Sequence, residues 1–262
     1  MDLATAVGPS GGHGPHSTRR SYAQACPVAH GLDLVGERWT LLIVRDLMFG
    51  PLRFGEIRDG LPGLSANLLS SRLSTLVHAG VVEKVHQPVP GSRHVYRLTR
   101  RGRELAPVVH ALARFGVRDW PDPDLAPPPR RLVRGALLAL MDPESLGTAT
   151  WNALIRLDQV DILLSVGPPH ERGHALDRLR LREVGPDSEN HVLHDTTEHG
   201  MAQHGMACVT TSLGTLWSLG RGSYSLGEAL ERDDIRIEGP DEVTTRLIAL
   251  FGWSADAATV PT

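Results

Sequence analysis

The histidine-rich stretch between residues 191 and 204 is the densest group of side chains that could do chemistry. Imidazole and carboxylate groups are metal ligands, and the first two histidines are spaced so that a helix would present both to one ion. The stretch lacks a tetrahedral pattern such as paired Cys-x-x-Cys, so we interpret it as a polar loop and expect no metal and no other cofactor. Its members are His191, His194, Asp195, Glu198, His199 and His204.

No other group of residues indicates catalysis. Gly220-Arg221-Gly222 is too short to cradle a phosphate, and it lacks the third glycine of the dinucleotide-binding pattern. No nucleophile–base pair and no pair of carboxylates can be placed from the sequence. We therefore predict that the chain is not an enzyme.

Cys26 is the remaining reactive group, and two interpretations of it stay open. A thiol becomes a sensor of oxidants or electrophiles when a helix N-terminus or a nearby cation favours the thiolate, and Arg19 and Arg20 are close in sequence. The alternative is a small buried hydrophobic residue. The second cysteine, Cys208, is far away in the chain, so the pair is not the disulfide framework of a secreted protein.

The charges divide the chain into two halves. Residues 19–120 carry 15 Lys and Arg against 8 Asp and Glu, a net +7, whereas residues 121–262 carry 12 against 21, a net −9. This asymmetry suggests that only the first half meets a polyanion. No apolar run approaches the ~20 residues that span a bilayer, and the N-terminus has no apolar signal core, so we expect a cytoplasmic protein without a membrane partner.

Helical periodicity dominates the first half. Apolar residues recur at spacings of three and four from Leu32 to Met48, which predicts one amphipathic helical region ended by Gly50-Pro51. A short helix over residues 54–61 follows. After a turn, Ser65 is a good N-cap for a third helix, which ends at Gly80.

Two β-prone runs follow the third helix. Residues 81–85 and 95–98 predict a hairpin, because prolines and a glycine separate them. A helix from Thr99 to about Trp120, bent near Pro107, closes this half. Short helix, turn, helix and hairpin is the order of a winged helix-turn-helix.

The third helix has one apolar and one small, polar side. Leu69, Leu73 and Leu76 share the apolar stripe. A polar face alone could be merely solvated, but the net +7 and the hairpin favour insertion into a major groove, with cations on phosphates. We predict contacts to double-stranded operator DNA from Arg53, Arg58, Ser65, Asn67, Ser70, Ser71, Arg72, Ser74, Thr75, Arg93, His94 and Arg97.

Several separated motifs in residues 25–118 agree in order with one known family. They are Cys26-Pro27-Val28-Ala29, Leu34-Val35-Gly36-Glu37-Arg38-Trp39-Thr40, Gly50-Pro51-Leu52-Arg53-Phe54-Gly55-Glu56-Ile57, Leu61-Pro62-Gly63-Leu64-Ser65-Ala66-Asn67 and Tyr96-Arg97-Leu98-Thr99-Arg100-Arg101-Gly102. On these motifs the segment resembles the HxlR family of bacterial regulators, which is related to MarR-type proteins. The resemblance implies a homodimeric winged-helix DNA binder whose N- and C-terminal helices make the dimer contacts. The dimer face that it implies here is Leu105, Val108, Val109, Leu112 and Phe115.

The second half reads as a separate α+β domain. The predicted organisation is a tail over 1–24, the winged helix-turn-helix over 25–120, a proline-rich linker over 121–130 and a sheet-and-helix domain over 131–255. The segment from Leu226 to Phe251 resembles the end of sterol-carrier-protein-like domains, which implies a pocket for a small hydrophobic effector. Its candidate lining residues are Trp151, Leu213 and Trp217, although plain core is the favoured interpretation of each one taken alone.

The sequence thus predicts a dimeric transcription regulator, with repression as the default, whose second domain senses an apolar effector. The first alternative is thiol sensing through Cys26 with a purely structural second domain. In a second alternative residues 130–255 are only a dimer platform without a cavity. In a third, the C-terminal domain is a carrier or small-molecule enzyme fused to a DNA anchor.

Overall fold

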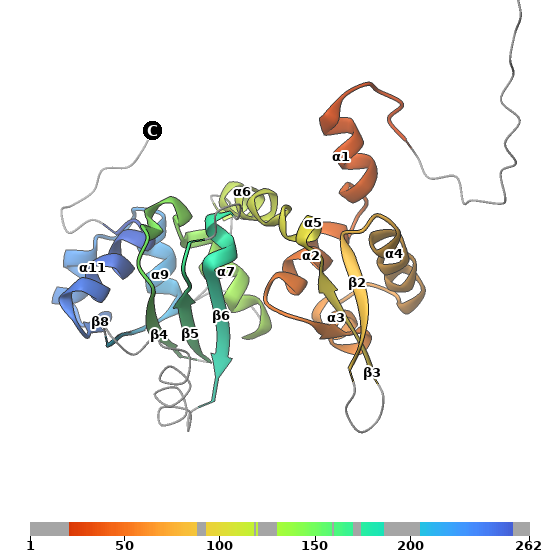
Figure 1. Cartoon of the computed structure of the whole chain (residues 1–262). Helices are drawn as coiled ribbons and strands as arrows, with labels where there is room; N and C mark the ends of the chain where they lie inside the picture. The colour runs from red at the N-terminus through yellow and green to blue at the C-terminus, as the bar shows by residue number, and fades with distance from the viewer. Residues whose placement is uncertain are drawn as a thin grey trace, which may run out of the picture.

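The computed structural model describes residues 21–87, 93–117, 119, 130–158, 160–169, 174–185 and 205–253. It is a mixed α+β fold whose first half is a winged helix-turn-helix and whose second half is a sheet with helices (Figure 1). The histidine-rich stretch, the hairpin tip and most of the predicted tail and linker lie outside the described residues. Within the described residues, no helix is long and apolar enough to cross a membrane.

The first half follows the predicted order of elements, with one strand that the sequence did not predict, β1. Its third helix, α4, is capped by Ser65 and followed by Gly80 at φ 68°, as expected. The elements are α1 (Pro27–Val35), α2 (Thr40–Met48), β1 (Leu52–Arg53), α3 (Phe54–Gly60), α4 (Ala66–His78), β2 (Val82–Gln87), β3 (Arg93–Leu98), α5 (Arg100–Arg103) and α6 (Ala106–Val117).

The predicted continuous helical region from Leu32 to Met48 is wrong, because the chain breaks between α1 and α2. Gly36 caps α1, and a Cβ at this position would lie 2.6 Å from the carbonyl oxygen of Leu32. Trp39 then takes a left-handed conformation at φ 79°, which no continuous helix allows. As a result α1 projects from the rest of this half (Figure 1).

The predicted closing helix is also two helices. Residues 104 and 105 separate α5 from α6, so the chain breaks ahead of Pro107 instead of bending at it. Proline is tolerated in the first turn of a helix, where its missing N–H has no partner to lose. Position 107 is in the first turn of α6, which explains why the break comes before it.

A three-stranded antiparallel sheet in the order β1-β3-β2 forms the wing. In β2 and β3, Val82 pairs with Leu98 and Gln87 with Arg93. The core beneath it comes from α2, α3 and α4, with Ile43, Ile57 and Leu69 fully buried. Apolar burial on one side of each helix therefore fixes α4 against the wing.

The second half is a five-stranded sheet in the order β6-β5-β4-β7-β8. All neighbours are antiparallel except β4 and β7, which pair in parallel with Asn152 opposite Met206. Its central strand β4 was not predicted. The elements are η1 (Arg130–Leu132), α7 (Val133–Leu140), η2 (Pro143–Leu146), β4 (Trp151–Leu157), β5 (Val160–Val166), η3 (Ala175–Arg178), β6 (Leu179–Val184), β7 (Met206–Thr211), α9 (Leu213–Gly220), α10 (Leu226–Glu231), β8 (Ile235–Glu238) and α11 (Asp241–Leu250).

Helix α6 connects the two halves through side-chain contacts. Val109 belongs to the first core, whereas Ala106 packs in the core of the second half. The imidazole Nε2 of His110 lies 3.0 Å from the carbonyl oxygen of Met141, just after α7. On the other side, the guanidinium of Arg134 in α7 stacks 4.9 Å from the ring centre of Phe49, which caps α2. The first and second halves are thus in direct contact.

Candidate nucleic-acid interface

Helix α4 presents a small, polar surface on a fixed scaffold. The Oγ of Ser65 accepts a hydrogen bond from the N–H of Leu68 (3.3 Å), which satisfies one donor at the helix start. Leu69, Leu73 and Leu76 are at most 1% exposed and hold the helix against the core. On the opposite side, the exposed side chains at spacings of three and four are Asn67, Ser70, Ser71, Ser74 and His78.

Two of the predicted contact residues on α4 sit at the edge of this surface. Thr75 is half-buried. Arg72 is 20% exposed at its side chain, and its Nη2 donates to Oε2 of Glu37 at 2.8 Å. Glu37 lies in the break between α1 and α2, so this ion pair ties α4 to the turn that orients α1. Sequence reasoning missed Glu37, because its partner is 35 positions away.

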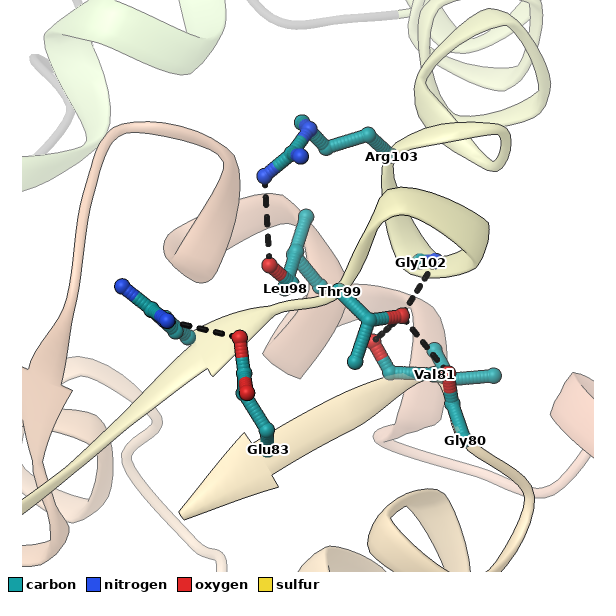
Figure 2. A network of polar contacts seen from close by, with 8 residues as sticks. Gly80, Val81, Glu83, Leu98, Thr99, Gly102 and Arg103 are labelled. Carbon is teal, nitrogen blue, oxygen red and sulfur yellow. Dashed lines mark hydrogen bonds and ion pairs between the residues drawn. The ribbon is translucent and has the colours of Figure 1, made fainter. Parts of the chain in front are cut away.

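Thr99 connects the base of the wing to the end of α4 through hydrogen bonds. Its hydroxyl donates to the carbonyl oxygen of Gly80 (2.6 Å), lies 3.2 Å from that of Val81, and accepts from the N–H of Gly102 (3.0 Å) (Figure 2). Arg103 adds a hydrogen bond from Nη1 to the carbonyl oxygen of Leu98 (3.3 Å). One hydroxyl therefore joins three elements: the C-terminus of α4, β3 and α5.

Two neighbours of Thr99 complete this junction. Arg101 donates from Nη1 to the carbonyl oxygen of Ala79 (2.8 Å), the residue that caps α4. A cation at a helix C-terminus also interacts favourably with the helix dipole. A Cβ at Gly102 would lie 2.1 Å from the carbonyl oxygen of Val81, so no larger residue fits. These contacts explain why Thr, Arg and Gly occupy these positions.

The predicted phosphate-binding cations surround α4 on two elements. Arg53 is exposed at the start of α3, and Arg58 is exposed within it, 3.2 Å from the carboxylate of Asp59. On the wing, Arg97 pairs with Glu83 at 2.7 Å, and exposed His94 contacts His86 edge to face. Arg93 begins β3, but its side chain is outside the described residues. These ion pairs are at the surface, where each contributes little to stability.

The predicted dimer residues separate into an outer and an inner group on α6. Val108, Leu112 and Phe115 are 49%, 54% and 74% exposed and recur at spacings of three and four. Leu105 is half-buried and Val109 is buried in the core of the first half. Two further exposed apolar residues, Val28 and Leu32, lie on α1, for which the resemblance implied dimer contacts without a prediction of individual residues.

The remaining predicted site residues are dispersed. Cys26 is the N-cap residue of α1 and is half-buried. Trp151 on β4 is 2% exposed and Trp217 on α9 is 4% exposed, whereas Leu213 is partly exposed at the start of α9. Of these three, only Trp217 lines the apolar cavity between α2, α6, α7 and α9. No group of metal-ligating side chains occurs among the residues that the structure describes.

Known proteins resemble this chain over its first half. A family model described as HxlR-like helix-turn-helix matches residues 34–123. The HTH-type transcriptional regulator Rv3095 of Mycobacterium tuberculosis is 44% identical over 100 residues, 38% of this chain and 63% of that protein. The HTH-type transcriptional regulator sll1512 of Synechocystis is 39% identical over 95 residues, 36% of this chain and 70% of that protein.

A solved structure gives a similar match. The reduced form of the transcriptional regulator YodB from Bacillus subtilis is 32% identical and covers 40% of this chain and 100% of that one, with a TM-score of 0.32. The alignment with Rv3095 covers 63% of that protein's length, whereas that with sll1512 covers 70%. Since the family model matches and sll1512 is 39% identical over 70% of its own length, the chain belongs to the HxlR-like helix-turn-helix family.

Proposed function

We propose that this protein is a homodimeric transcription regulator that binds operator DNA through α4 and the wing, and that it represses its targets. The observation that carries the proposal is the exposed polar stripe of α4, backed by a fully buried leucine stripe. Small polar side chains can approach base edges in a major groove without steric conflict. A DNA-binding role would place the protein in the cytoplasm, at the nucleoid.

Charge supports a nucleic-acid partner. The net +7 of residues 19–120 contrasts with the net −9 of the remainder. Arg53 and Arg58 on one side of α4 and Arg97 on the wing can contact phosphates on both sides of a groove. Because phosphate contacts release counterions, affinity should fall steeply as salt rises.

The apolar stripe of α6 supports dimerisation. Val108, Leu112 and Phe115 expose about half or more of their surface on one helix face, which is unfavourable in water unless a partner covers it. The exposed Val28 and Leu32 extend the same argument to α1. Two copies would double the number of bases that are read.

We further propose that the C-terminal half is a sterol-carrier-like module that senses a small apolar effector. Its support is architectural: a five-stranded sheet carries its helices over an apolar core. Under this proposal residues 27–117 read DNA and residues 130–253 sense, with the junction at α6 and α7.

The test selects DNA targets from a random pool with the full-length protein. Selection should yield a palindromic operator. On this operator, Asn67→Ala combined with Ser71→Ala should lower affinity by roughly 30-fold or more, because two lost base contacts cost about 1–3 kcal/mol each. Arg72→Ala is less informative, because it also breaks the ion pair with Glu37.

Thr244→Ala on α11 is the matched control, because it removes one hydroxyl from the other half of the molecule. It should leave operator affinity unchanged, and circular dichroism should show all variants folded. If no operator can be selected from the pool, or if the double variant binds like the parent chain, α4 is not the helix that reads DNA.

A second candidate function is a thiol response at Cys26. Its support is that Cys26 is half-buried at the start of α1, close to the proposed dimer surface, and that the relative YodB, 37% identical over 84 residues, has been solved in a reduced and a diamide-treated form. Diamide should then release the protein from its operator, and Cys26→Ser should abolish that release, whereas Cys208→Ser should not. Equal release of the parent and Cys26→Ser proteins rejects this function.

A further inference from the structure

An apolar cavity of about 240 Å³ lies where the two halves meet. Helices α2 and α6 of the DNA-binding half form one side, and α7 and α9 of the C-terminal half form the other. Its lining residues are Leu41, Leu42, Arg45, Val109, Leu112, Ala113, Gly116, Val117, Leu132, Gly135, Ala136, Ala139 and Trp217. The cavity is therefore built from segments more than 170 residues apart in the chain.

Small residues create the space. Ala113 and Gly116 on α6 face Gly135 and Ala136 on α7, and larger side chains at these positions would fill it. A Cβ at Gly116 would meet no atom within 4 Å. At Gly135 a Cβ would lie 3.6 Å from Cδ of Arg45, in ordinary contact. The two halves therefore pack closely around the cavity yet leave its interior open.

The electrostatic character of the walls favours an uncharged ligand. Arg45 is the one charged residue among the lining residues described, and its guanidinium is 2.8 Å from the carboxylate of Asp46. That neighbouring carboxylate offsets the positive charge, so an anionic ligand gains little at this position. The other walls are hydrocarbon and the indole of Trp217, a surface that binds aromatic molecules well.

The shape of the cavity favours a small molecule over a partner helix. Val109, Ala139 and Trp217 in its walls are 7%, 8% and 4% exposed, so these walls are recessed below the surface. Leu42 at the rim is 40% exposed and lies outside the proposed dimer face, which leaves a way in from solvent. Apolar cavities of about 150 Å³ bind benzene, so this one holds roughly one or two fused rings.

The geometry points to an effector site at this junction, which takes a compact, neutral, aromatic or alicyclic molecule. It differs from the pocket expected inside the C-terminal half, because Trp151 and Leu213 lie elsewhere and only Trp217 is shared. The regulatory part rests on the proposed function. A ligand that fits one relative placement of α2, α6 and α7 shifts the molecule toward that placement and so changes how α4 meets DNA.

The test uses the full-length protein and naphthalene, with decanoate as a charged, chain-like comparison. Calorimetry should show saturable binding of naphthalene at one site per chain and much weaker binding of decanoate. Ala113→Leu should reduce naphthalene affinity at least ten-fold, because the added carbons occupy the cavity. Ala111→Leu is the matched control, since Ala111 is exposed on the same helix and is not among the lining residues. It should bind naphthalene like the parent chain.

A second variant guards against an indirect effect of one substitution. Ala136→Leu fills the cavity from α7 and should give the same loss, while thermal unfolding shows that both filled variants remain folded. No saturable naphthalene binding to the parent chain, or equal binding by parent and both filled variants, overturns the site. Binding of naphthalene by a monomeric variant but not by the parent dimer would instead assign the cavity to a second copy and also overturn the site.

Operator affinity separates this inference from the proposed function. Without ligand, Ala113→Leu should bind the selected operator as well as the parent chain does. Naphthalene should change the operator affinity of the parent at least three-fold and that of Ala113→Leu not at all. Binding of naphthalene without any change in operator affinity overturns the regulatory role. Failure to bind any operator rejects the proposed function while leaving the cavity measurement intact.

Discussion

Helices α4 and α6 are alike on their inner sides, which face the core, and differ on their outer sides. Each buries an apolar stripe, represented by Leu73 in α4 and Val109 in α6. The outer side of α4 carries small polar residues such as Asn67 and Ser71, whereas that of α6 carries Val108 and Phe115. The outer surface therefore indicates the partner: a hydrated polyanion for α4 and a second apolar surface for α6.

The largest effect is expected when charged residues replace the exposed apolar residues on the outer side of α6. Val108→Glu combined with Phe115→Glu should turn the dimer into a monomer, because carboxylates cannot be buried against each other. Operator affinity should fall about 100-fold or more, since two linked half-site contacts become one. Sedimentation and gel-shift titration measure both.

Glu104→Gln, an exposed change near the start of α6, is the control and should leave dimerisation intact. If the double variant remains dimeric, the outer side of α6 is not a dimer surface and does not differ in this respect from that of α4. That result would show that α6 is merely solvated.

The next effect concerns the scaffold behind α4. Gly102→Ala places a Cβ against the carbonyl oxygen of Val81, and the wing must shift to relieve the overlap. We expect a loss of about 2 kcal/mol in unfolding free energy and weaker operator binding. Denaturant unfolding followed by tryptophan fluorescence measures the first quantity.

Gly55→Ala on α3 is the matched substitution, because a Cβ there meets no atom within 4 Å. It should be neutral or stabilise by up to about 1 kcal/mol. Equal stability of the two variants would show that the junction around Thr99 tolerates movement.

The smallest effect is expected on the pH dependence of stability, through His110 on the inner side of α6. Burial lowers the pKa of His110, with Arg114 and His174 acting in the same direction, while the Met141 carbonyl and Asp142 act against the shift. The folded protein therefore takes up the proton less readily than the unfolded chain, whose histidines titrate near ~6.5. Stability should be greatest above that pH and decrease as pH falls from there toward the lowered pKa.

His110→Gln keeps a donor toward the carbonyl oxygen of Met141 and removes the titration. Its midpoint of thermal unfolding should depend less on pH between 7.5 and 5.5 than that of the parent chain. Identical pH profiles would mean that His110 does not connect α6 to the C-terminal half through a titrating contact.

Much of α4 and its surroundings could be predicted from the sequence, because the signals are local. Ser65 and Gly80 mark its ends, and leucines three and four residues apart define its buried side. The break at Trp39 could not be predicted, because apolar spacing continues across it while one residue adopts a left-handed conformation. Strand β4 escaped prediction because it is buried on both sides, and Leu154 interrupts the alternation that Asn152 and Arg156 would otherwise give.

The cavity between the halves could not be predicted at all. Its lining residues lie on four different helices, with Leu41 the first in the chain and Trp217 the last. No local sequence pattern connects residues so far apart. The same holds for the ion pair of Glu37 and Arg72. Sequence patterns therefore define which surface a helix exposes, whereas the packing between helices defines what that surface encloses.

The most direct test of the central claim is the mass of the complex on a selected operator. Sedimentation equilibrium of the full-length protein with that DNA should give two chains per duplex at saturation. Asn67→Ala combined with Ser71→Ala should stay dimeric and lose the operator. A saturated complex with one chain per duplex, or a double variant that still binds with full affinity, would contradict the account.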